Sequence, residues 1–507
     1  MKLKKYQESE STFLELKADS LEKRSLDVLL LGKAILYFET KRFGEAKNIY
    51  NELLNTTSDA LVLMQAYLGK AESLYNLAEY REAVNVYKEA IEKTAAQAVI
   101  PQEIFDKLHY GLAWAYLKEG EFKEAIDEFQ KLVRRTEDKI VKISALCQIG
   151  DTYQDSGDFN KAQETYDGIL RDYPDSLYSD YVQYQLGLTL LKASNFDGAI
   201  MSLLSLKKNS PNSKLLDDAS YTLGLAYFQK EDYASSKEIF EKFQLDFKDS
   251  PLRPQGTYLL GTCLYNLGKF AEAIEVFKDI IRQHSQDTEL IQKAEYEIAD
   301  CYYRMGNEEE AMVRFKMLRS KYPDSRLTPE VMWWLGEYYY RRNDLALARR
   351  YFASLIQDFP KSNLVASAYY TLGSIYEEES RYQEAIENFK KAAELDNSDL
   401  AGTAAIAIAD IYVKQEKLDL AIQMYNSVTQ EHNNLTHLIY PKMADIYKEK
   451  NNYEQALDLY RRSLEVVPIR QMADVQFKIA ETLEAEAKVT EAIEEYLKVT
   501  YLYSENQ

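Results

Sequence analysis

The chain is poor in the residues that build disulfide frameworks and metal centres. It has three cysteines, Cys147, Cys263 and Cys301, and four histidines among 507 residues. Three cysteines cannot form a complete disulfide framework, and the histidines are not spaced with them as metal ligands, so we expect buried free thiols and no metal site. Proline (10) and glycine (18) are also scarce, and no Pro-rich or Gly/Ser-rich linker divides the chain into domains.

Positive charge is in deficit as well. Asp and Glu number 82 against 62 Lys and Arg, for a formal net charge of −20. Binding to nucleic acid needs clustered Lys and Arg, so no nucleic-acid partner is expected, and we interpret the acidic excess as solvated helix faces. The sequence lacks a run of about 18 apolar residues, so no transmembrane segment is expected. It also lacks GxSxG, HExxH and Gly-rich phosphate-loop motifs, which predicts a protein that is not an enzyme and binds no cofactor.

What the sequence contains instead is one pattern repeated thirteen times. A small residue recurs at intervals of 35 to 38 residues, with one interval of 42, and it serves here as the anchor from which positions in each repeat are counted. A period of this size indicates one supersecondary unit stacked many times. The anchors are Ala34, Ala71, Ala113, Gly150, Gly187, Gly224, Gly261, Ala299, Gly336, Gly373, Ala409, Ala444 and Ala480.

Other positions keep a fixed register to the anchor. Position +12 is alanine except at Ser236, position +16 is aromatic except at Leu203, and position +3 is always Tyr or Leu. Apolar residues within a repeat have helical spacing, and a turn such as 155–158 separates two amphipathic segments. We expect the small residues to let the two helices of a repeat approach closely, and the aromatic side chains to fill the gap to the next repeat.

This register resembles that of the tetratricopeptide repeat. The matching residues in the fourth repeat are Gly150, Tyr153, Gly157, Phe159, Ala162, Tyr166 and Pro174. The resemblance implies an all-α fold, a right-handed α-solenoid (superhelix) of about thirteen helix-turn-helix repeats. We expect residues 1–20 to be a lead-in segment and residues 21–507 one continuous solenoid.

Three local features refine this prediction. The extra residues near 93–104 predict a lengthened helix or a surface loop. Pro441 falls inside an expected first helix, which should start late or kink. Between repeats, junctions such as Pro174-Asp175-Ser176 should stop the outgoing helix and cap the incoming one.

The C-terminus stops after the second helix of a complete repeat. Solenoids normally end in a polar capping helix, so we expect the chain to be a fragment of a longer solenoid, or this end to pack against another copy. In the alternative, the last helix bends back over its own repeat. The apolar residues concerned are Tyr496, Leu497, Val499, Tyr501 and Leu502.

In the resembling family the first helices line the concave face, where partners bind near positions −3, +1, +4 and +5. Aromatic residues occupy position −3 without a break from the fifth to the tenth repeat, and Tyr and Trp are frequent binding anchors. The opposing interpretation is that these aromatics serve packing alone. The predicted partner-binding residues are Tyr221, Phe228, Tyr258, Tyr265, Tyr296, Tyr303, Arg304, Trp333, Tyr340, Arg341 and Tyr370.

We therefore predict a non-catalytic scaffold that binds a protein or peptide partner in its groove. Junctions such as Tyr-Pro-Asp-Ser at 173–176 resemble those of bacterial cell-envelope repeat proteins, namely outer-membrane assembly lipoproteins and Tol–Pal-associated periplasmic proteins, which implies the periplasm or cell envelope. A full-length chain would instead be cytoplasmic. The alternatives are a polysaccharide-binding or export solenoid, in which the aromatics stack on sugar rings, and the regulatory arm of a larger enzyme.

Overall fold

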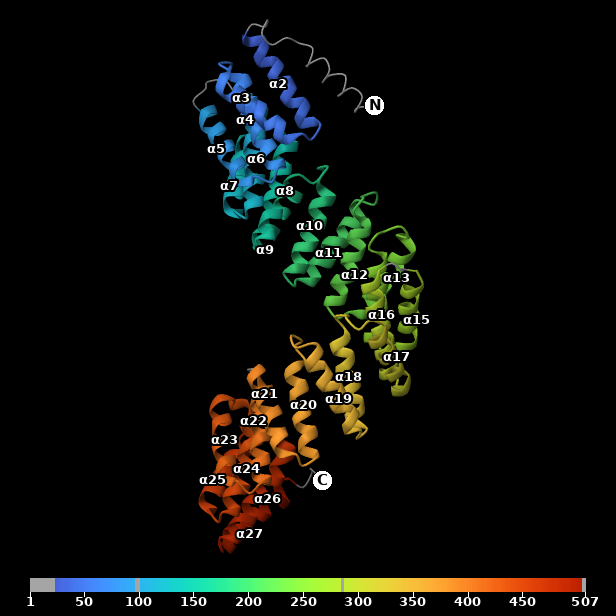
Figure 1. The fold of residues 1–507 in the computed structure, drawn as a ribbon, viewed down its shortest axis with the longest axis vertical. Coiled ribbons are helices and arrows are strands. Elements are labelled where there is room, and N and C mark those ends of the chain that lie inside the picture. The colour runs from blue at the N-terminus through green and yellow to red at the C-terminus, as the bar shows by residue number, and fades with distance from the viewer. Residues whose placement is uncertain (1–22, 96–100, 284–286, 397, 504–507) are drawn as a thin grey trace. The chain divides into compact units, whose positions relative to one another are not determined.

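The computed structural model describes residues 23–95, 101–283, 287–396 and 398–503, which form two compact units (Figure 1). The first unit is residues 1–269 and the second is residues 270–507. The described ranges contain 26 α-helices, one short 3₁₀ helix and no strand, which confirms the predicted all-α solenoid class. The expected lead-in at 1–20 lies outside the described residues, and continuity from 21 to 507 stays a prediction.

In the first unit, first and second helices of the repeats alternate along the chain. The first helices are α2 (Lys23–Glu39), α4 (Ala60–Asn76), α6 (Gln102–Glu119), α8 (Lys139–Asp155), α10 (Ser179–Lys192), α12 (Leu216–Gln229) and α14 (Arg253–Asn266). The second helices are α3 (Phe43–Thr56), α5 (Tyr80–Ala95), α7 (Phe122–Arg135), α9 (Phe159–Asp172), α11 (Phe196–Asn209) and α13 (Tyr233–Asp246).

The second unit opens with a second helix, α15 (Phe270–Gln283), and then follows the same alternation. Its first helices are α16 (Thr288–Arg304), α18 (Thr328–Arg341), α20 (Val365–Glu378), α22 (Asp399–Lys414), α24 (Thr436–Glu449) and α26 (Ile469–Ala485). Its other second helices are α17 (Glu308–Lys321), α19 (Leu345–Asp358), α21 (Tyr382–Leu395), α23 (Leu418–Glu431), α25 (Tyr453–Leu464) and α27 (Val489–Leu502).

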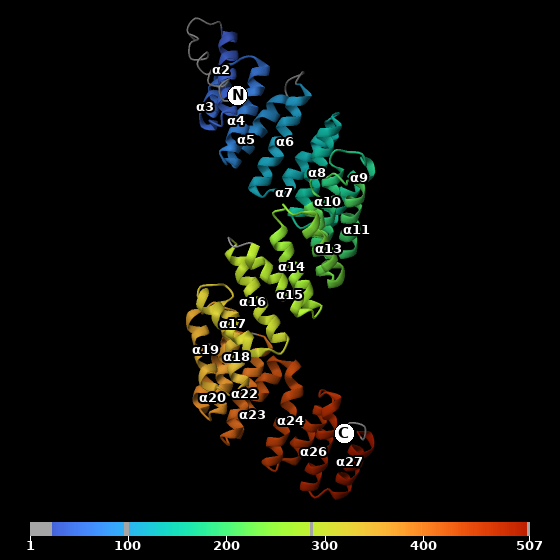
Figure 2. The ribbon, with the colours of Figure 1, turned by 90° about the vertical axis from the view of Figure 1, so that its right-hand side faces the viewer.

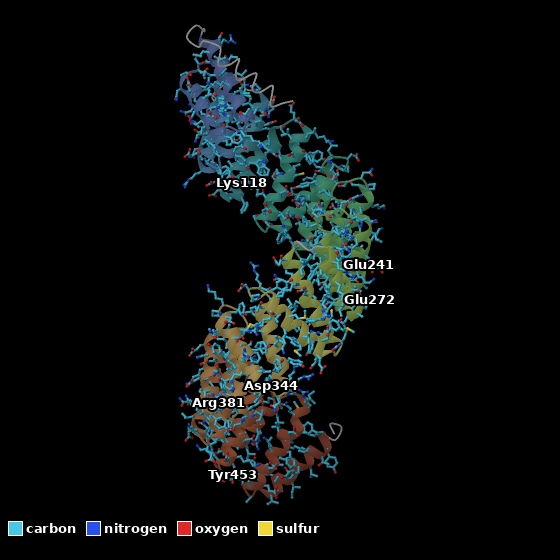
Figure 3. All side chains as sticks on the ribbon, turned by 45° about the vertical axis from the view of Figure 1, so that its right-hand side comes forward. Lys118, Glu241, Glu272, Asp344, Arg381 and Tyr453 are labelled. Carbon is cyan, nitrogen blue, oxygen red and sulfur yellow. The ribbon has the colours of Figure 1, made fainter. Side chains whose placement is uncertain are left out.

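Within each unit, consecutive helices pack against one another (Figure 2). First helices of neighbouring repeats also touch, as α2 does with α4 and α20 with α22. They therefore share one surface in each unit, which we call the first-helix face. Charged side chains, among them Lys118 and Arg381, lie at the surface of both units (Figure 3).

The core follows the anchor register. The Phe240 ring is fully buried, and a Cβ placed on Gly224, the anchor of the same repeat, would lie 2.7 Å from it. The small anchor thus makes room for the aromatic residue at position +16. That residue also joins the core of the following repeat, as Phe129 does with Ala145 and Ile149. The predicted roles of small and aromatic residues are confirmed. Burial of such a ring stabilises the fold by about 1.5–3 kcal/mol.

The turn between the two helices has the same backbone conformation in every repeat. The residue at position +7 has a positive φ throughout, from Ser194 at 59° to Gly157 at 81°. Only four of these residues are glycine, so most repeats hold a side chain in the left-handed region. The next residue caps several second helices, since the Asp232 carboxylate accepts the N–H of Ser235 and the Asn195 side chain accepts that of Gly198.

The junctions between repeats correct one prediction. The serines after proline do not cap the incoming first helices. Instead, Ser176 Oγ accepts the N–H of Tyr178 before the helix begins, and α10 has no side-chain cap. The equivalent Ser213 hydroxyl also donates to Asp180 Oδ2 at 2.6 Å. The serine thus stabilises the turn and ties it to the preceding repeat.

The structure tests parts of the predictions made for Pro441 and for residues 93–104. Helix α24 begins at Thr436, eight residues before its anchor, as α12 and α20 do. Of the two predicted outcomes, the late start was therefore wrong, because Pro441 lies inside the helix, and a kink stays a prediction. Of the extra segment near 93–104, residues 96–100 lie outside the described residues, while α5 extends to Ala95 and α6 begins at Gln102.

The final helix carries the expected apolar surface. In α27, Tyr501 is 77% exposed and Leu502 is 69% exposed. Tyr496 and Val499 are half-buried, and the Tyr496 hydroxyl donates to Glu484 Oε2 at 2.8 Å. Self-association through this surface stays a prediction.

The predicted buried free thiols are confirmed for all three cysteines. Burial raises the pKa of Cys147 and Cys301 to about 12 and also raises that of Cys263. Because the thiolate is the nucleophile, we expect no alkylation of the folded protein by iodoacetamide over about one hour near pH 8, and complete alkylation after unfolding in urea. Mass spectrometry counts the adducts, and rapid labelling of the folded chain would contradict this burial.

Candidate functional site

Two adjoining pockets lie on the first-helix face of the first unit. One holds about 410 Å³ and is lined by Phe38, Glu72, Tyr75, Asn76, Tyr87, Gly111 and Trp114. The other holds about 700 Å³ and is lined by Glu72, Gly111 and residues of α6, α8 and the segment before α10. Because both pockets include Glu72 and Gly111, we treat them as one site and call it the Glu72 groove.

The repeat register explains how these side chains come together. Glu72 and Trp114 each follow an anchor directly, and Phe38 and Tyr75 each lie four residues after one. These are the predicted first-helix positions. Each of the four side chains is half-buried, so it is held by the fold and still presents surface to the groove.

The groove is acidic. Glu72, Glu103, Asp106, Glu137 and Asp138 line it, with Lys107 as the single lysine or arginine among the lining residues of the two pockets. The Lys107 ammonium donates to Glu103 at 2.7 Å. Asp106 accepts the Thr136 hydroxyl at 2.9 Å, and Asp138 caps α8. Most of these carboxylates therefore have partners within the chain.

Glu72 is half-buried and lacks such a partner among the described residues, whereas Glu137 is exposed to solvent. No donor within hydrogen-bond distance of the Glu72 carboxylate is found in the described part of the chain. Burial raises the pKa of Glu72, and the positive charge of Lys107 opposes that shift. Burial also raises the pKa of the neighbouring Tyr87. A cation from another molecule would stabilise the charged form of such a half-buried carboxylate.

In three other repeats the carboxylate of an aspartate at the same position accepts hydrogen bonds from within the chain. Asp410 accepts the hydroxyl of Tyr425 and, at 2.6 and 2.7 Å, the ammonium of Lys442. Asp445 in the next repeat accepts Tyr460 and Lys478 in the same way.

The fourth repeat uses two tyrosines instead. Asp151 accepts the hydroxyls of Tyr166 at 2.6 Å and Tyr181 at 2.8 Å. Burial raises the pKa of Asp151, while the two hydroxyls oppose the shift. Glu337 in the ninth repeat, by contrast, resembles Glu72, since burial raises its pKa and the charge of Arg341 opposes that shift.

The residues predicted from the sequence are divided between the two units. Tyr221, Phe228, Tyr258 and Tyr265 lie in the first unit, and the others lie in the second. Tyr221 packs edge-on against Phe240 at 5.8 Å, and Phe228 packs against Tyr233 at 5.4 Å. Tyr258 and Tyr265 lie half-buried on α14.

In the second unit, three aromatic residues at position −3 make the same kind of contact. Tyr296 packs edge-on against Phe315 at 5.3 Å, and Trp333 against Phe352 at 5.2 Å. Tyr370 makes the same contact with Phe389 at 5.2 Å. The residue at −3 thus packs on the core aromatic of its own repeat and remains half-buried. Packing therefore accounts for part of this ladder, and its role in partner binding stays a prediction.

The structure brings Tyr303 and Arg341 together. The Arg341 guanidinium lies 5.3 Å from the centre of the Tyr303 ring and also donates to Glu308 at 3.2 Å. Arg304 lies 3.5 Å from Asp300. The predicted basic centre is therefore partly neutralised by acidic residues of the same unit.

Tyr340 also has a partner within the second unit. Its hydroxyl donates to Glu378 Oε1 at 2.6 Å, and desolvation by burial, together with that hydrogen bond, raises its pKa. Trp334, which the sequence did not single out, lies between Tyr303 and Phe315, with ring centres at 5.4 and 4.5 Å.

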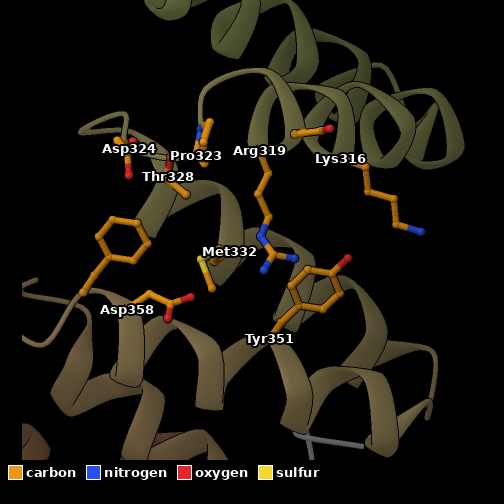
Figure 4. A pocket seen from close by; sticks show the side chains of 10 residues that line it. Lys316, Arg319, Pro323, Asp324, Thr328, Met332, Tyr351 and Asp358 are labelled. Carbon is orange, nitrogen blue, oxygen red and sulfur yellow. The ribbon is translucent and has the colours of Figure 1, made fainter.

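A separate pocket of about 700 Å³ lies between α17, α18 and α19 in the second unit (Figure 4). Arg319 extends into it past Met332, and its guanidinium lies 5.3 Å from the centre of the Tyr351 ring. Asp324 and Asp358 line the same pocket. It is built mainly from second helices and does not belong to the first-helix face.

None of the helices in the described ranges has the length and apolar character of a membrane-spanning segment. No group of three or more His, Cys, Asp or Glu side chains in the same ranges is arranged to hold a metal ion. His284 lies outside the described residues.

Comparison with known proteins identifies the repeat. Segments along the chain match models described as tetratricopeptide repeat, at residues 68–139, 144–176, 181–213, 221–288, 293–325, 327–398, 364–430 and 442–506. No curated protein matches the sequence.

Several solved structures are similar at low identity. The apo form of RapI shares 15% identity over 66% of this chain and 97% of its own, with a TM-score of 0.43. A tetratricopeptide repeat protein from Parabacteroides merdae shares 16% over 62% and 98%, with a TM-score of 0.35. Yeast Tom70 shares 15% over 81% and 92%, with a TM-score of 0.37. The assignment rests on the sequence models, which match most of the chain: it belongs to the tetratricopeptide repeat family.

Proposed function

We propose that this protein is a non-catalytic scaffold that binds a segment of a partner protein along the first-helix face of its repeats. The Glu72 groove is the observation that carries this proposal. It extends over α2, α4, α6 and α8 and combines half-buried aromatic walls with few charged groups free of partners. Such a surface offers rigid apolar area with polar tips, which is the composition of protein-binding sites.

Two further features support the proposal. The second unit presents half-buried aromatics on the equivalent face, with Trp333 and the Tyr303–Arg341 pair at its centre. Cation–π pairs and exposed tryptophan edges are frequent in interfaces. The junctions at 173–176 and 359–362 favour a bacterial cell-envelope assembly as the setting.

Site-specific photo-crosslinking tests the proposed face. p-Benzoylphenylalanine at Asn76, an exposed residue of the Glu72 groove, should crosslink a protein partner in the native host. The same group at Met201, which is 70% exposed on the second helix α11, should not. Mass spectrometry identifies the crosslinked protein.

Affinity measurements with that purified partner complete the test. Tyr75→Ala should weaken binding at least tenfold, which corresponds to about 1.4 kcal/mol, as for an interface hot spot. Circular dichroism should show unchanged helicity. Equal crosslinking from Asn76 and Met201, or an unchanged affinity of Tyr75→Ala, would contradict the proposed face.

A further inference from the structure

The surroundings of Glu72 can be compared with those of the carboxylates at the same position in other repeats. In the eleventh and twelfth repeats, the carboxylate at position +1 binds a tyrosine at +16 and a lysine two residues before the next anchor. Lys442 and Lys478 are those lysines, and each places its ammonium within 3 Å of the carboxylate. The second repeat has the carboxylate Glu72 and the tyrosine Tyr87 at the same positions.

The lysine is missing from this set. Gly111 stands two residues before the next anchor, where the later repeats have Lys442 and Lys478. A Cβ on Gly111 would lie 2.4 Å from the Tyr87 hydroxyl, which no real contact allows. With the Tyr87 ring in this position, residue 111 has no room for a lysine side chain. Glu72 therefore lines the groove without the lysine that Asp410 and Asp445 have.

The surroundings of Glu72 suit a cation. Tyr75, Tyr87 and Trp114 line the same pocket, and aromatic faces attract ammonium and guanidinium groups. The charge of Lys107 acts on Glu72, but the Lys107 ammonium is bound to Glu103.

We infer that the Glu72 groove binds a lysine or arginine side chain of an extended segment of the partner protein, with the cation in the place that Lys442 and Lys478 occupy in their own repeats. This inference rests on the proposed scaffold function and names the chemistry that the groove recognises. An ion pair formed here is partly desolvated, so it contributes more than a pair at the open surface.

The length of the groove favours a polypeptide over a small free cation. The second pocket continues from Gly111 along α6 to Ile140, Val141 and Tyr178. Residues flanking the bound lysine or arginine, each advancing about 3.3–3.6 Å along an extended chain, would lie against these apolar side chains. The remaining carboxylates of the groove favour further positive charge in the same segment.

Fluorine NMR of protein labelled with 5-fluorotryptophan tests the site directly. Trp114 lines the groove, while the other tryptophans, Trp333 and Trp334, lie in the second unit and serve as internal references. The probes are blocked pentapeptides that differ only at the central residue, which is lysine, arginine or norleucine. The lysine and arginine peptides should shift the Trp114 signal in a saturable manner, and the norleucine peptide should bind at least tenfold more weakly.

A matched pair of variants separates charge recognition from general effects. Glu72→Gln keeps the shape of the side chain and should weaken binding of the lysine and arginine peptides at least tenfold, without changing the affinity for norleucine. Glu337→Gln makes the same change at the same repeat position in the second unit, where burial also raises the pKa of the carboxylate, and should leave all three affinities measured at Trp114 unchanged. Equal binding of norleucine and lysine peptides, or an unchanged affinity of Glu72→Gln, would overturn the inference.

Two further measurements test whether the occupant is a polypeptide and whether the scaffold function is correct. Spermidine binding as tightly as the lysine peptide would overturn a polypeptide as the occupant. Crosslinking of the partner from Asn76 should persist in Glu72→Gln at reduced yield. If crosslinking persists at full yield, the scaffold function stands and the cation site is wrong, whereas loss of all crosslinking in the unsubstituted protein contradicts the scaffold function itself.

Discussion

Phe352→Ala is expected to lower the free energy of unfolding of the second unit by about 3–5 kcal/mol. Phe352 is fully buried, its ring would lie 2.7 Å from a Cβ on the anchor Gly336, and Trp333 packs on its edge. Removal of the ring leaves a cavity bordered on one side by helix backbone, which cannot move in to fill it. Contacts in a solenoid join mainly neighbouring repeats, so the loss should stay local.

Calorimetry and hydrogen exchange followed by mass spectrometry check this expectation. Peptides from α18 to α20 should lose protection, while peptides from α4 to α13 should keep it. Tyr351→Ala, at the preceding position on the same helix, is the matched control, because Tyr351 is half-buried, and it should cost about 1 kcal/mol. A cost below about 1 kcal/mol for Phe352→Ala, or equal loss of protection in both units, would contradict a local core role.

The same contact changes how the predicted groove must be tested. Trp333 and Tyr296 rest on Phe352 and Phe315, so their removal exposes core aromatics as well as deleting binding surface. A weaker interaction of Trp333→Ala would therefore mix packing with recognition. Arg341 is a cleaner choice, because its contacts are an exposed ion pair with Glu308 and the Tyr303 ring.

The fold was largely predictable because its signals are local and repeated. A small anchor and an aromatic residue sixteen positions later can be read from sequence, since a constant turn length between two helices brings the two positions together in every repeat. The turn at position +7 was less visible. Its positive φ is constant, but residues such as Lys41, Ala78 and Glu231 occupy it in most repeats, so no glycine pattern marks it.

The Glu72 groove shows what the sequence concealed. Aromatic density directed the prediction to the sixth to tenth repeats, but much of that density serves edge-on packing against residues such as Phe389. The informative signal in the second repeat is the absence of a partner. The structure shows that Lys442 binds Asp410. Gly111 stands at the same repeat position as Lys442, and only this comparison reveals that Glu72 lacks the corresponding lysine.

A buried histidine–glutamate pair in the third repeat gives the second large effect. Glu128 on α7 is 8% exposed and His109 on α6 is 5% exposed. Glu128 Oε2 lies 2.6 Å from His109 Nδ1, and its other oxygen accepts the Lys131 ammonium at 2.5 Å. Burial works to raise the pKa of Glu128, but the hydrogen bonds of His109 and Lys131 outweigh it and hold that pKa below its ordinary value of 4.5.

Glu128→Gln should therefore lower the free energy of unfolding by about 1.5–3 kcal/mol near neutral pH, as for hydrogen bonds to a charged group. A carboxylate whose pKa is lower in the folded state stabilises the fold above its unfolded pKa, and this contribution is lost as the pH falls through the folded value. Urea unfolding followed by circular dichroism should show a difference between variant and wild type that is constant above about pH 5.5 and shrinks below about pH 4.5. Glu124→Gln, at an exposed position of the same helix, should change stability by less than about 0.5 kcal/mol at any pH. A Glu128→Gln difference that does not depend on pH would mean that shape rather than charge holds α6 against α7.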